Sequence, residues 1–167
     1  MSSNHIPTEA SSSVLSQDVS RSMLLEDQLC FALYSASLAM TKFYEPLLAP
    51  LSLTYPQHPV MLVMWEHTEQ TVGALSDPLP LDSGTLTPLL KRLEFQGLTT
   101  RERDSDEERR VIIRSLQEGK DLKRLAENMP LSIAAAIRRR GGDIDSLINS
   151  VTALRDSLID SRHDECC

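Results

Sequence analysis

The sequence is poor in cysteine, aromatic residues and long apolar runs. Only three of its 167 residues are cysteines, and 4% are aromatic. Three cysteines, two of them adjacent, do not make a disulfide framework, and no His or Cys spacing is typical of a zinc site. No apolar run approaches the roughly 18 residues that a membrane span needs. We therefore expect a chain in the reducing cytoplasm, without a metal, a cofactor or a transmembrane segment.

The N-terminus also lacks the basic and apolar regions of a secretory signal. It is rich in serine, so we expect a disordered polar tail over residues 1–22. A second, flexible tail is expected over residues 161–167, which include Cys166 and Cys167. The remaining length suits one globular domain with a core of its own.

Positive charge is scarce in the chain as a whole. Its 17 basic and 24 acidic residues give a net charge of −7, which argues against nucleic acid because phosphate binding needs a basic surface. Between Lys91 and Arg114, however, seven basic residues face six acidic ones. This segment is compatible with a DNA-binding face and equally with a solvated charged face that has no partner.

Apolar periodicity predicts a long helix followed by a buried one. Residues at three- and four-residue steps from Leu29 to Leu47 form a helical stripe, and Pro46 and Pro50 mark its end. The next helix opens near Pro56, and its apolar run "VMLVMWEH" implies burial.

Two capped helices and a hairpin come next. Thr71 suits the cap of a short helix, "TVGALSDPL", and Asp82 suits the cap of the helix that ends at Gly97. The buried stripe of this second helix consists of Leu86, Leu89, Leu90 and Leu93. Residues 98–116 have β-branched ends and a charged centre, which predicts a β-hairpin with a charged tip.

Helical patterns return over residues 118–129 and, after Gly141 and Gly142, over residues 144–159. The predicted order is four helices, a hairpin and two helices, so the fold class is mainly α with a small β-hairpin wing. This is the order of a winged helix-turn-helix, in which the second capped helix enters the major groove. Its candidate DNA-binding residues are Asp82, Ser83, Thr85, Thr87, Lys91 and Arg92, with Arg109 and Arg110 of the wing suited to a narrow minor groove. A wing used only for protein contacts is the alternative.

Four segments resemble the MarR family of regulators, and more closely the organic hydroperoxide resistance regulators (OhrR type). They are "LEDQLCFALYSASLAMTKFYEPLL", "LTYPQHPVMLVMWEH", "LDSGTLTPLLKRLEFQGL" and "TRERDSDEERRVIIRSL". The resemblance implies a homodimer with interlocked terminal helices that represses genes from double-stranded operator DNA until a peroxide releases it. It divides the chain into a dimerisation helix with the sensor cysteine (23–54), a DNA-binding region (55–116) and C-terminal dimerisation helices (117–160).

The resemblance assigns the redox sensor to Cys30. It also matches Tyr34, Tyr44 and Tyr55 to tyrosines that hydrogen-bond the thiol across the dimer. The chemistry is sound independently, because the thiolate is the nucleophile toward a peroxide O–O bond and phenol donors favour the charged form. The first product would be a sulfenic acid. Without the resemblance, a lone helical cysteine is better interpreted as inert core.

Other residues near the expected sensor have two interpretations. The side chains of Phe31, Met61, Met64 and Trp65 would either line a pocket for apolar organic peroxides or form plain core. His58 and His67 lie nine residues apart without a cluster, so we assign them no metal.

The chain departs from the family pattern at two places. Between Phe31 and Glu165 there is no second cysteine to resolve oxidised Cys30, so resolution would fall to Cys166 or Cys167, or to a low-molecular-weight thiol. In the wing, Glu107 stands two residues before Arg109, where relatives often place an aspartate that supports the arginine.

Two alternatives to a peroxide sensor remain open. One is a repressor of the same family that a small apolar or phenolic ligand releases, with the cysteine structural. The other is a thiol peroxidase, for which the sequence offers no fitting motif, so we do not expect an enzyme.

Overall fold

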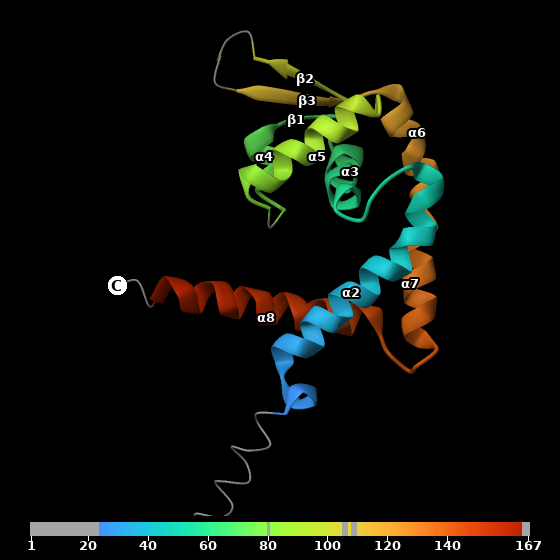
Figure 1. The fold of residues 1–167 in the computed structure, drawn as a ribbon, viewed down its shortest axis with the longest axis vertical. Coiled ribbons are helices and arrows are strands. Elements are labelled where there is room, and N and C mark those ends of the chain that lie inside the picture. The colour runs from blue at the N-terminus through green and yellow to red at the C-terminus, as the bar shows by residue number, and fades with distance from the viewer. Residues whose placement is uncertain (1–23, 80, 105–106, 108–109, 165–167) are drawn as a thin grey trace, which may run out of the picture.

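The computed structural model describes residues 24–79, 81–104, 107 and 110–164. In Figure 1 a small winged domain, which holds the sheet, lies above helices from the N-terminal and C-terminal parts of the chain. The predicted tail over residues 1–22, Arg109, Cys166 and Cys167 lie outside the described residues, as does the side chain of Ser83. In chain order the elements are η1 (Leu25–Asp27), α2 (Leu29–Leu48), η2 (Ala49–Leu51), α3 (Gln57–Glu66), β1 (Glu69–Thr71), α4 (Val72–Ser76), α5 (Ser83–Phe95), β2 (Thr99–Arg103), β3 (Val111–Ser115), α6 (Gln117–Ala126), α7 (Met129–Arg138) and α8 (Ile144–Asp164).

The sheet is a three-stranded antiparallel sheet in the order β1-β3-β2. Its hairpin pairs Thr99 with Ser115 and Arg101 with Ile113, which confirms the predicted wing. Strand β1 pairs Gln70 with the same Ile113 from the other side. The sequence analysis missed β1, because three residues are too short to show a period of two.

The core of the winged domain lies between α3, α4, α5 and the inner face of the sheet. The predicted stripe of α5 is buried, with Leu86 and Leu93 at 0% exposure. It packs in one cluster with Val60 and Met64 of α3 and with Ile113 of β3. Burying each such side chain contributes about 1.5–3 kcal/mol, so this stripe fixes which face of α5 remains outside.

The end of α2 lies between Pro46 and Pro50, as the sequence predicts. Pro46 lies inside α2, which continues to Leu48. Because a proline has no N–H to donate to the carbonyl four residues earlier, the helix continues for only two residues beyond it. Pro50 instead occupies the first turn of η2. Helix α7, which the sequence analysis did not predict, likewise carries Pro130 in its first turn.

The C-terminal part contains three helices where two were predicted. Helix α6 ends at Ala126 and α7 begins at Met129, so the pattern over residues 118–129 covers the end of one helix and the first residue of another. Helix α8 runs to Asp164, beyond residue 160, where the expected C-terminal tail begins. None of the described helices is long and apolar enough to cross a bilayer.

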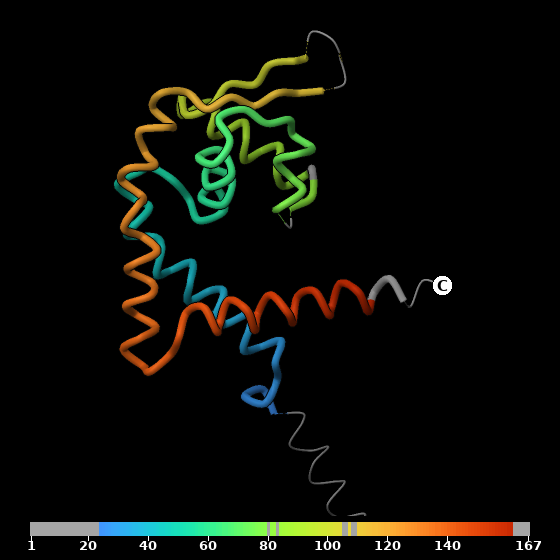
Figure 2. Tube along the Cα trace, turned by 180° about the vertical axis from the view of Figure 1, so that it is seen from behind, coloured from blue at the N-terminus to red at the C-terminus, as the bar shows by residue number. Residues whose placement is uncertain are grey.

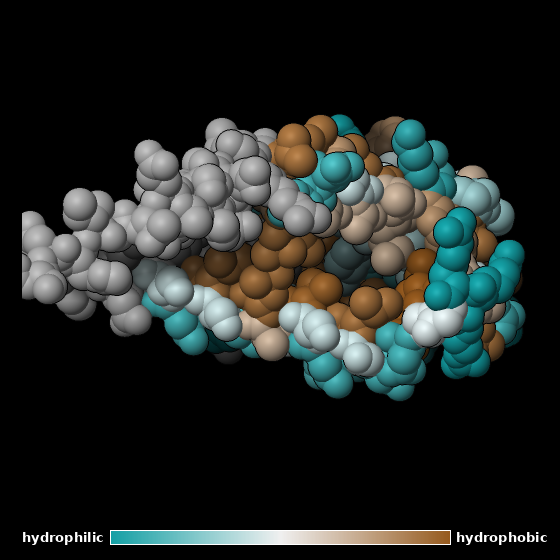
Figure 3. Space-filling model, turned by 90° about the horizontal axis from the view of Figure 1, so that it is seen from below, coloured by the Kyte–Doolittle hydropathy of each residue, from teal (hydrophilic) through white to brown (hydrophobic). Residues whose placement is uncertain are grey.

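Helices α2 and α8 cross each other (Figure 2), and both carry exposed apolar side chains. A groove between them is lined by Leu33 of α2 and by Val151, Leu154 and Leu158 of α8. Seen from below, apolar side chains lie on both sides of a hollow (Figure 3). Exposed apolar residues on these two helices include Leu29, Leu38, Leu147, Ile148, Val151, Leu158 and Ile159. Apolar surface of this extent marks an interaction site.

Candidate functional site

The outer face of α5 carries the predicted DNA-binding residues. The Asp82 carboxylate accepts a 2.7 Å hydrogen bond from the Thr85 backbone N–H, which confirms its predicted role as the cap. Asp82, Thr85, Lys91 and Arg92 are exposed, while Thr87 is partly buried. Since the leucines of the same helix face the core, these polar side chains lie on one accessible surface.

Helix α4 is positioned in front of α5 by a cap of its own. Thr71 Oγ1 accepts a 3.1 Å hydrogen bond from the Ala74 backbone N–H, as the sequence predicts. A cleft of about 410 Å³ lies between the start of α4, Thr87 of α5 and the base of the wing. Arg101 and Arg110 line it, so two guanidinium groups face the space between α5 and the wing.

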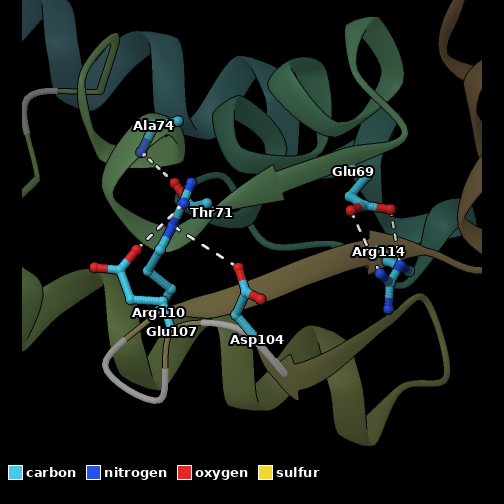
Figure 4. A network of polar contacts seen from close by, with 7 residues as sticks. All are labelled: Glu69, Thr71, Ala74, Asp104, Glu107, Arg110 and Arg114. Atoms are coloured by element: carbon cyan, nitrogen blue, oxygen red, sulfur yellow. Dashed lines mark hydrogen bonds and ion pairs between the residues drawn. The ribbon is translucent and has the colours of Figure 1, made fainter.

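Arg110 is held at the tip of the wing by two carboxylates (Figure 4). Its Nη1 lies 3.3 Å from Glu107 Oε2, and its Nε lies 4.0 Å from Asp104 Oδ2. The Glu107 carboxylate, which the sequence matched to the support of Arg109, therefore holds Arg110. The guanidinium is half exposed, so it stays accessible while its direction is restricted.

Arg114 joins all three strands of the sheet. It lies on the central strand β3, where its Nε donates a 2.8 Å hydrogen bond to Glu69 of β1 and its Nη1 donates another to Glu102 of β2. The bond to Glu69 is the larger cause of a raised pKa of Arg114. The contact with Glu69 could not be predicted from the sequence, because Glu69 lies in the unpredicted strand β1.

Cys30 lies in the first turn of α2 and is exposed as a free thiol. Tyr34 follows one turn later on the same side and is 63% exposed. Among the described residues, no side chain makes a hydrogen bond to the thiol. Tyr44 lies fourteen residues along the helix, so at 1.5 Å per residue it is about 21 Å from Cys30. One chain therefore does not bring Tyr44 to the thiol.

Tyr44 is the centre of an aromatic cluster at the other end of α2. Its ring centroid lies 5.5 Å from that of Tyr55 and 5.4 Å from that of His58. His58 in turn meets Trp65 edge to face at 6.3 Å. The sequence matched two of the tyrosines to the sensor but missed His58, because a single histidine in an apolar run carries no signal of stacking.

Burial keeps the polar groups of this cluster neutral. It raises the pKa of the Tyr44 phenol, and the nearby Tyr55 adds to the effect. It lowers the pKa of His58. At neutral pH Tyr44 is therefore a phenol that can donate a hydrogen bond, and His58 is an uncharged imidazole.

A mostly apolar cavity of about 240 Å³ lies beside the cluster, lined by Tyr44, His58, Leu62 and Trp65 among others. Of the two interpretations of Phe31, Met61, Met64 and Trp65, plain core holds for the two methionines, whereas Trp65 lines this cavity. Met61 and Met64 are fully buried core, and Phe31 lies in the first turn of α2. No group of described residues has the composition of a metal site.

Trp65 ties the cluster to the helix that leaves the winged domain. Its Nε1 donates a buried 2.7 Å hydrogen bond to the Gly119 carbonyl oxygen of α6. Lys123 of α6 donates a 3.0 Å bond back to the Trp65 carbonyl. Two hydrogen bonds thus join α3 and α6, one donated from each helix.

Comparisons with known proteins agree with this geometry. A family model described as transcriptional regulator SarA/Rot matches residues 42–125. Over 136 residues the chain is 46% identical to the organic hydroperoxide resistance transcriptional regulator of Bacillus subtilis (strain 168). That match covers 81% of this chain and 92% of the relative.

The fold matches solved structures of AbfR from Staphylococcus epidermidis. Reduced AbfR bound to DNA is 32% identical, with a TM-score of 0.68, over 83% of this chain and 98% of that one. A disulfide-formed AbfR matches with 31% identity and a TM-score of 0.60, over 88% and 98% of the two chains. The same fold therefore exists in a DNA-bound and in an oxidised form.

Proposed function

Because this chain belongs to the MarR family of transcriptional regulators, among the organic hydroperoxide resistance regulators, we propose that it is a peroxide-sensing repressor. Its reduced form binds double-stranded operator DNA, and oxidation of Cys30 by an organic hydroperoxide releases it. The single observation that carries the proposal is the accessible thiol of Cys30 on a helix that also bears the Tyr44 cluster, joined to a winged helix-turn-helix. Its known relatives are regulators and not enzymes.

The DNA contacts assigned to α5 and the wing follow from their exposure. Thr85, Lys91 and Arg92 present hydroxyl, ammonium and guanidinium donors on the outer face of α5, as major-groove reading requires. Arg110 extends from the wing with its guanidinium held in place but half exposed. An arginine so placed suits phosphate or the minor groove.

A homodimer accounts for the exposed apolar side chains of α2 and α8. These side chains would be buried if two copies packed these helices together, which contributes about 25 cal/mol per Å². Cys30 and Tyr44 lie at opposite ends of α2, so an antiparallel pair of these helices would bring the thiol of one copy toward Tyr44 of the other. That placement supports the use of Tyr34, Tyr44 and Tyr55 as hydrogen-bond donors to a partner's thiol.

The oxidation step is a displacement at the outer peroxide oxygen. The Cys30 thiolate forms an S–O bond as the O–O bond breaks, and the departing alkoxide takes up a proton to become the alcohol. The sulfenic acid then condenses with a thiol, losing water and forming a disulfide. That thiol is Cys166 or Cys167, or a low-molecular-weight thiol of the cytoplasm.

The experiment that tests the proposal is intact mass spectrometry beside operator binding. Stoichiometric cumene hydroperoxide should add one oxygen to Cys30, or a thiol adduct when a small thiol is present, and operator affinity should fall by more than about a hundredfold. Cys30→Ser should bind the operator like the wild type and ignore peroxide. Release of that variant by peroxide would refute the assignment of the sensor.

A second candidate is a repressor released by a small ligand in the cavity beside His58. The cavity favours it, although about 240 Å³ is below the 300–1,000 Å³ typical of drug-sized ligands. Release by an apolar phenol under strictly reducing conditions, and in the Cys30→Ser variant, would favour this candidate over peroxide sensing.

A further inference from the structure

The segment from Tyr55 to His58, which opens α3, faces α2 on one side and α5 on the other. Tyr55 and His58 place their rings against Tyr44 of α2. Gln57, between them in sequence, is only 2% exposed and points toward the end of α5. A turn this short moves as one body, so its two sides cannot shift independently.

Gln57 and Gln96 form a continuous chain of hydrogen bonds. Gln57 Oε1 accepts from the Thr54 backbone N–H at 2.8 Å and from its hydroxyl at 3.0 Å. Gln57 Nε2 donates to Gln96 Oε1 at 2.9 Å, and Gln96 Nε2 donates to the Ser52 carbonyl oxygen at 2.7 Å. Both amides therefore use an oxygen and a nitrogen, which determines which way each amide points.

These hydrogen bonds join segments of the protein that are far apart in sequence. Gln96 is the C-cap of α5, while Ser52 and Thr54 belong to the connection between α2 and α3. Ser52 has a φ of +55°, a rare backbone conformation for a residue with a side chain. The bonds between Gln57 and Thr54 are local to the turn that opens α3. The bonds through Gln96 have no such local role.

We propose that Gln57 and Gln96 are positioning residues that transmit displacement of the Tyr44 cluster to the recognition helix, an inference that rests on the proposed function. Oxidation that moves α2 shifts the start of α3, and the hydrogen bond between buried Gln57 and exposed Gln96 moves the C-terminal end of α5 with it. Helix α5 is 13 residues long, about 20 Å, so a tilt of about 5° displaces its DNA-reading end by about 2 Å.

The test is to remove the hydrogen bonds of Gln96 while leaving the Cys30 thiol and the DNA-binding face of α5 unchanged. Gln96→Met keeps the length of the side chain and removes both of its hydrogen bonds. The matched control is Gln117→Met, because Gln117 is an exposed glutamine whose side chain bonds to Asp121 on its own helix. For each full-length protein, operator affinity is measured before and after stoichiometric cumene hydroperoxide, and intact mass reports oxidation of Cys30.

We expect equal oxidation of Cys30 in all three proteins, with full release of the wild type and of Gln117→Met. In Gln96→Met the fold-loss of affinity on oxidation should shrink by about tenfold or more. The same fold-loss as the wild type would overturn the proposal. So would an equal drop in affinity in both redox states, because that is what a merely structural role predicts.

If Gln96→Met does not fold, a second variant tests the same proposal. Gln96→Glu still accepts the bond from Gln57 but has no donor for the Ser52 carbonyl oxygen, and it should shrink the fold-loss in the same direction. Unchanged release of a folded Gln96→Glu would again overturn the proposal. A wild-type protein that keeps its operator after oxidation would refute the proposed function itself, and the wild-type measurement reports that outcome separately.

Discussion

The close approach of α6 to the sheet makes Gly119→Ala a sharp test of the architecture. A Cβ atom at Gly119 would lie 2.3 Å from the Leu98 carbonyl oxygen and 3.2 Å from Ser115 Oγ. The first contact is with backbone, so α6 must retreat. Overpacking of this kind costs about 1–3 kcal/mol. Retreat also lengthens the 2.7 Å bond from Trp65 to the Gly119 carbonyl, a further loss of about 1 kcal/mol.

Alanine recovers up to about 1 kcal/mol of helix propensity, which leaves a net loss of about 1–3 kcal/mol in the free energy of unfolding. At a urea dependence of about 2 kcal/mol per molar, the midpoint should fall by about 0.5–1.5 M. Urea titration of reduced protein at one fixed protein concentration measures it. The matched control is Gly73→Ala in α4, where the new Cβ meets only Thr71 Oγ1 at 3.9 Å.

The control should leave the midpoint unchanged or raise it, because Gly73 is helical and has room for a methyl group. Both changes gain the same helix propensity. If Gly119→Ala lowers the urea midpoint and Gly73→Ala does not, the difference reports the steric contact at Gly119. A Gly119→Ala protein as stable as the wild type would refute the close approach of α6 to Leu98, and with it the path by which the winged domain is fixed to α7 and α8.

Three further measurements test the wing, the cluster and its link to α6. Arg110→Ala should weaken operator binding and lower the slope of log affinity against log salt by about 1, while Arg110→Lys should restore most of the slope. Burial lowers the pKa of His58 in the folded protein, so the unfolded chain binds more protons at this residue. The free energy of unfolding should therefore fall as the pH is lowered from about 6.5, the unfolded pKa, to the lower folded-state pKa. In urea titrations across pH, His58→Phe should flatten this fall and the exposed His67→Phe should not. Trp65→Phe should lower the free energy of unfolding by about 1–3 kcal/mol in a urea titration, because a buried carbonyl loses its donor.

The sequence predicted the elements whose signals are local. Caps are read from one side chain and one backbone N–H, and both Thr71 and Asp82 form the expected bonds. The leucines of α5 repeat over three turns and are buried as predicted. The wing followed from β-branched ends around a charged tip.

What the sequence could not predict depends on contacts between distant residues. Strand β1 is recognisable only by its pairing with β3, and α7 has a proline in its first turn, which in sequence indicates a helix break. His58 and Gln57 are ordinary polar residues in sequence and become a stacking partner and a buried bridge only after α2 and α5 pack against α3. One chain does not bring Cys30 and Tyr44 together, since they lie at opposite ends of one helix.

The arginines near the wing explain how a chain of net charge −7 can still meet DNA. Arg114 has one carboxylate on each side, from Glu69 and Glu102, so its charge is locally balanced and serves to hold the three strands together. Arg110 is different, because its contact with Glu107 is exposed and its contact with Asp104 is long. An exposed pair of this kind is worth about 0–1 kcal/mol, so a phosphate can replace the carboxylate at little cost. We therefore expect Arg110 to contribute to the salt dependence of operator binding, whereas loss of Arg114 should disturb the pairing of β1 and leave the salt slope nearly unchanged.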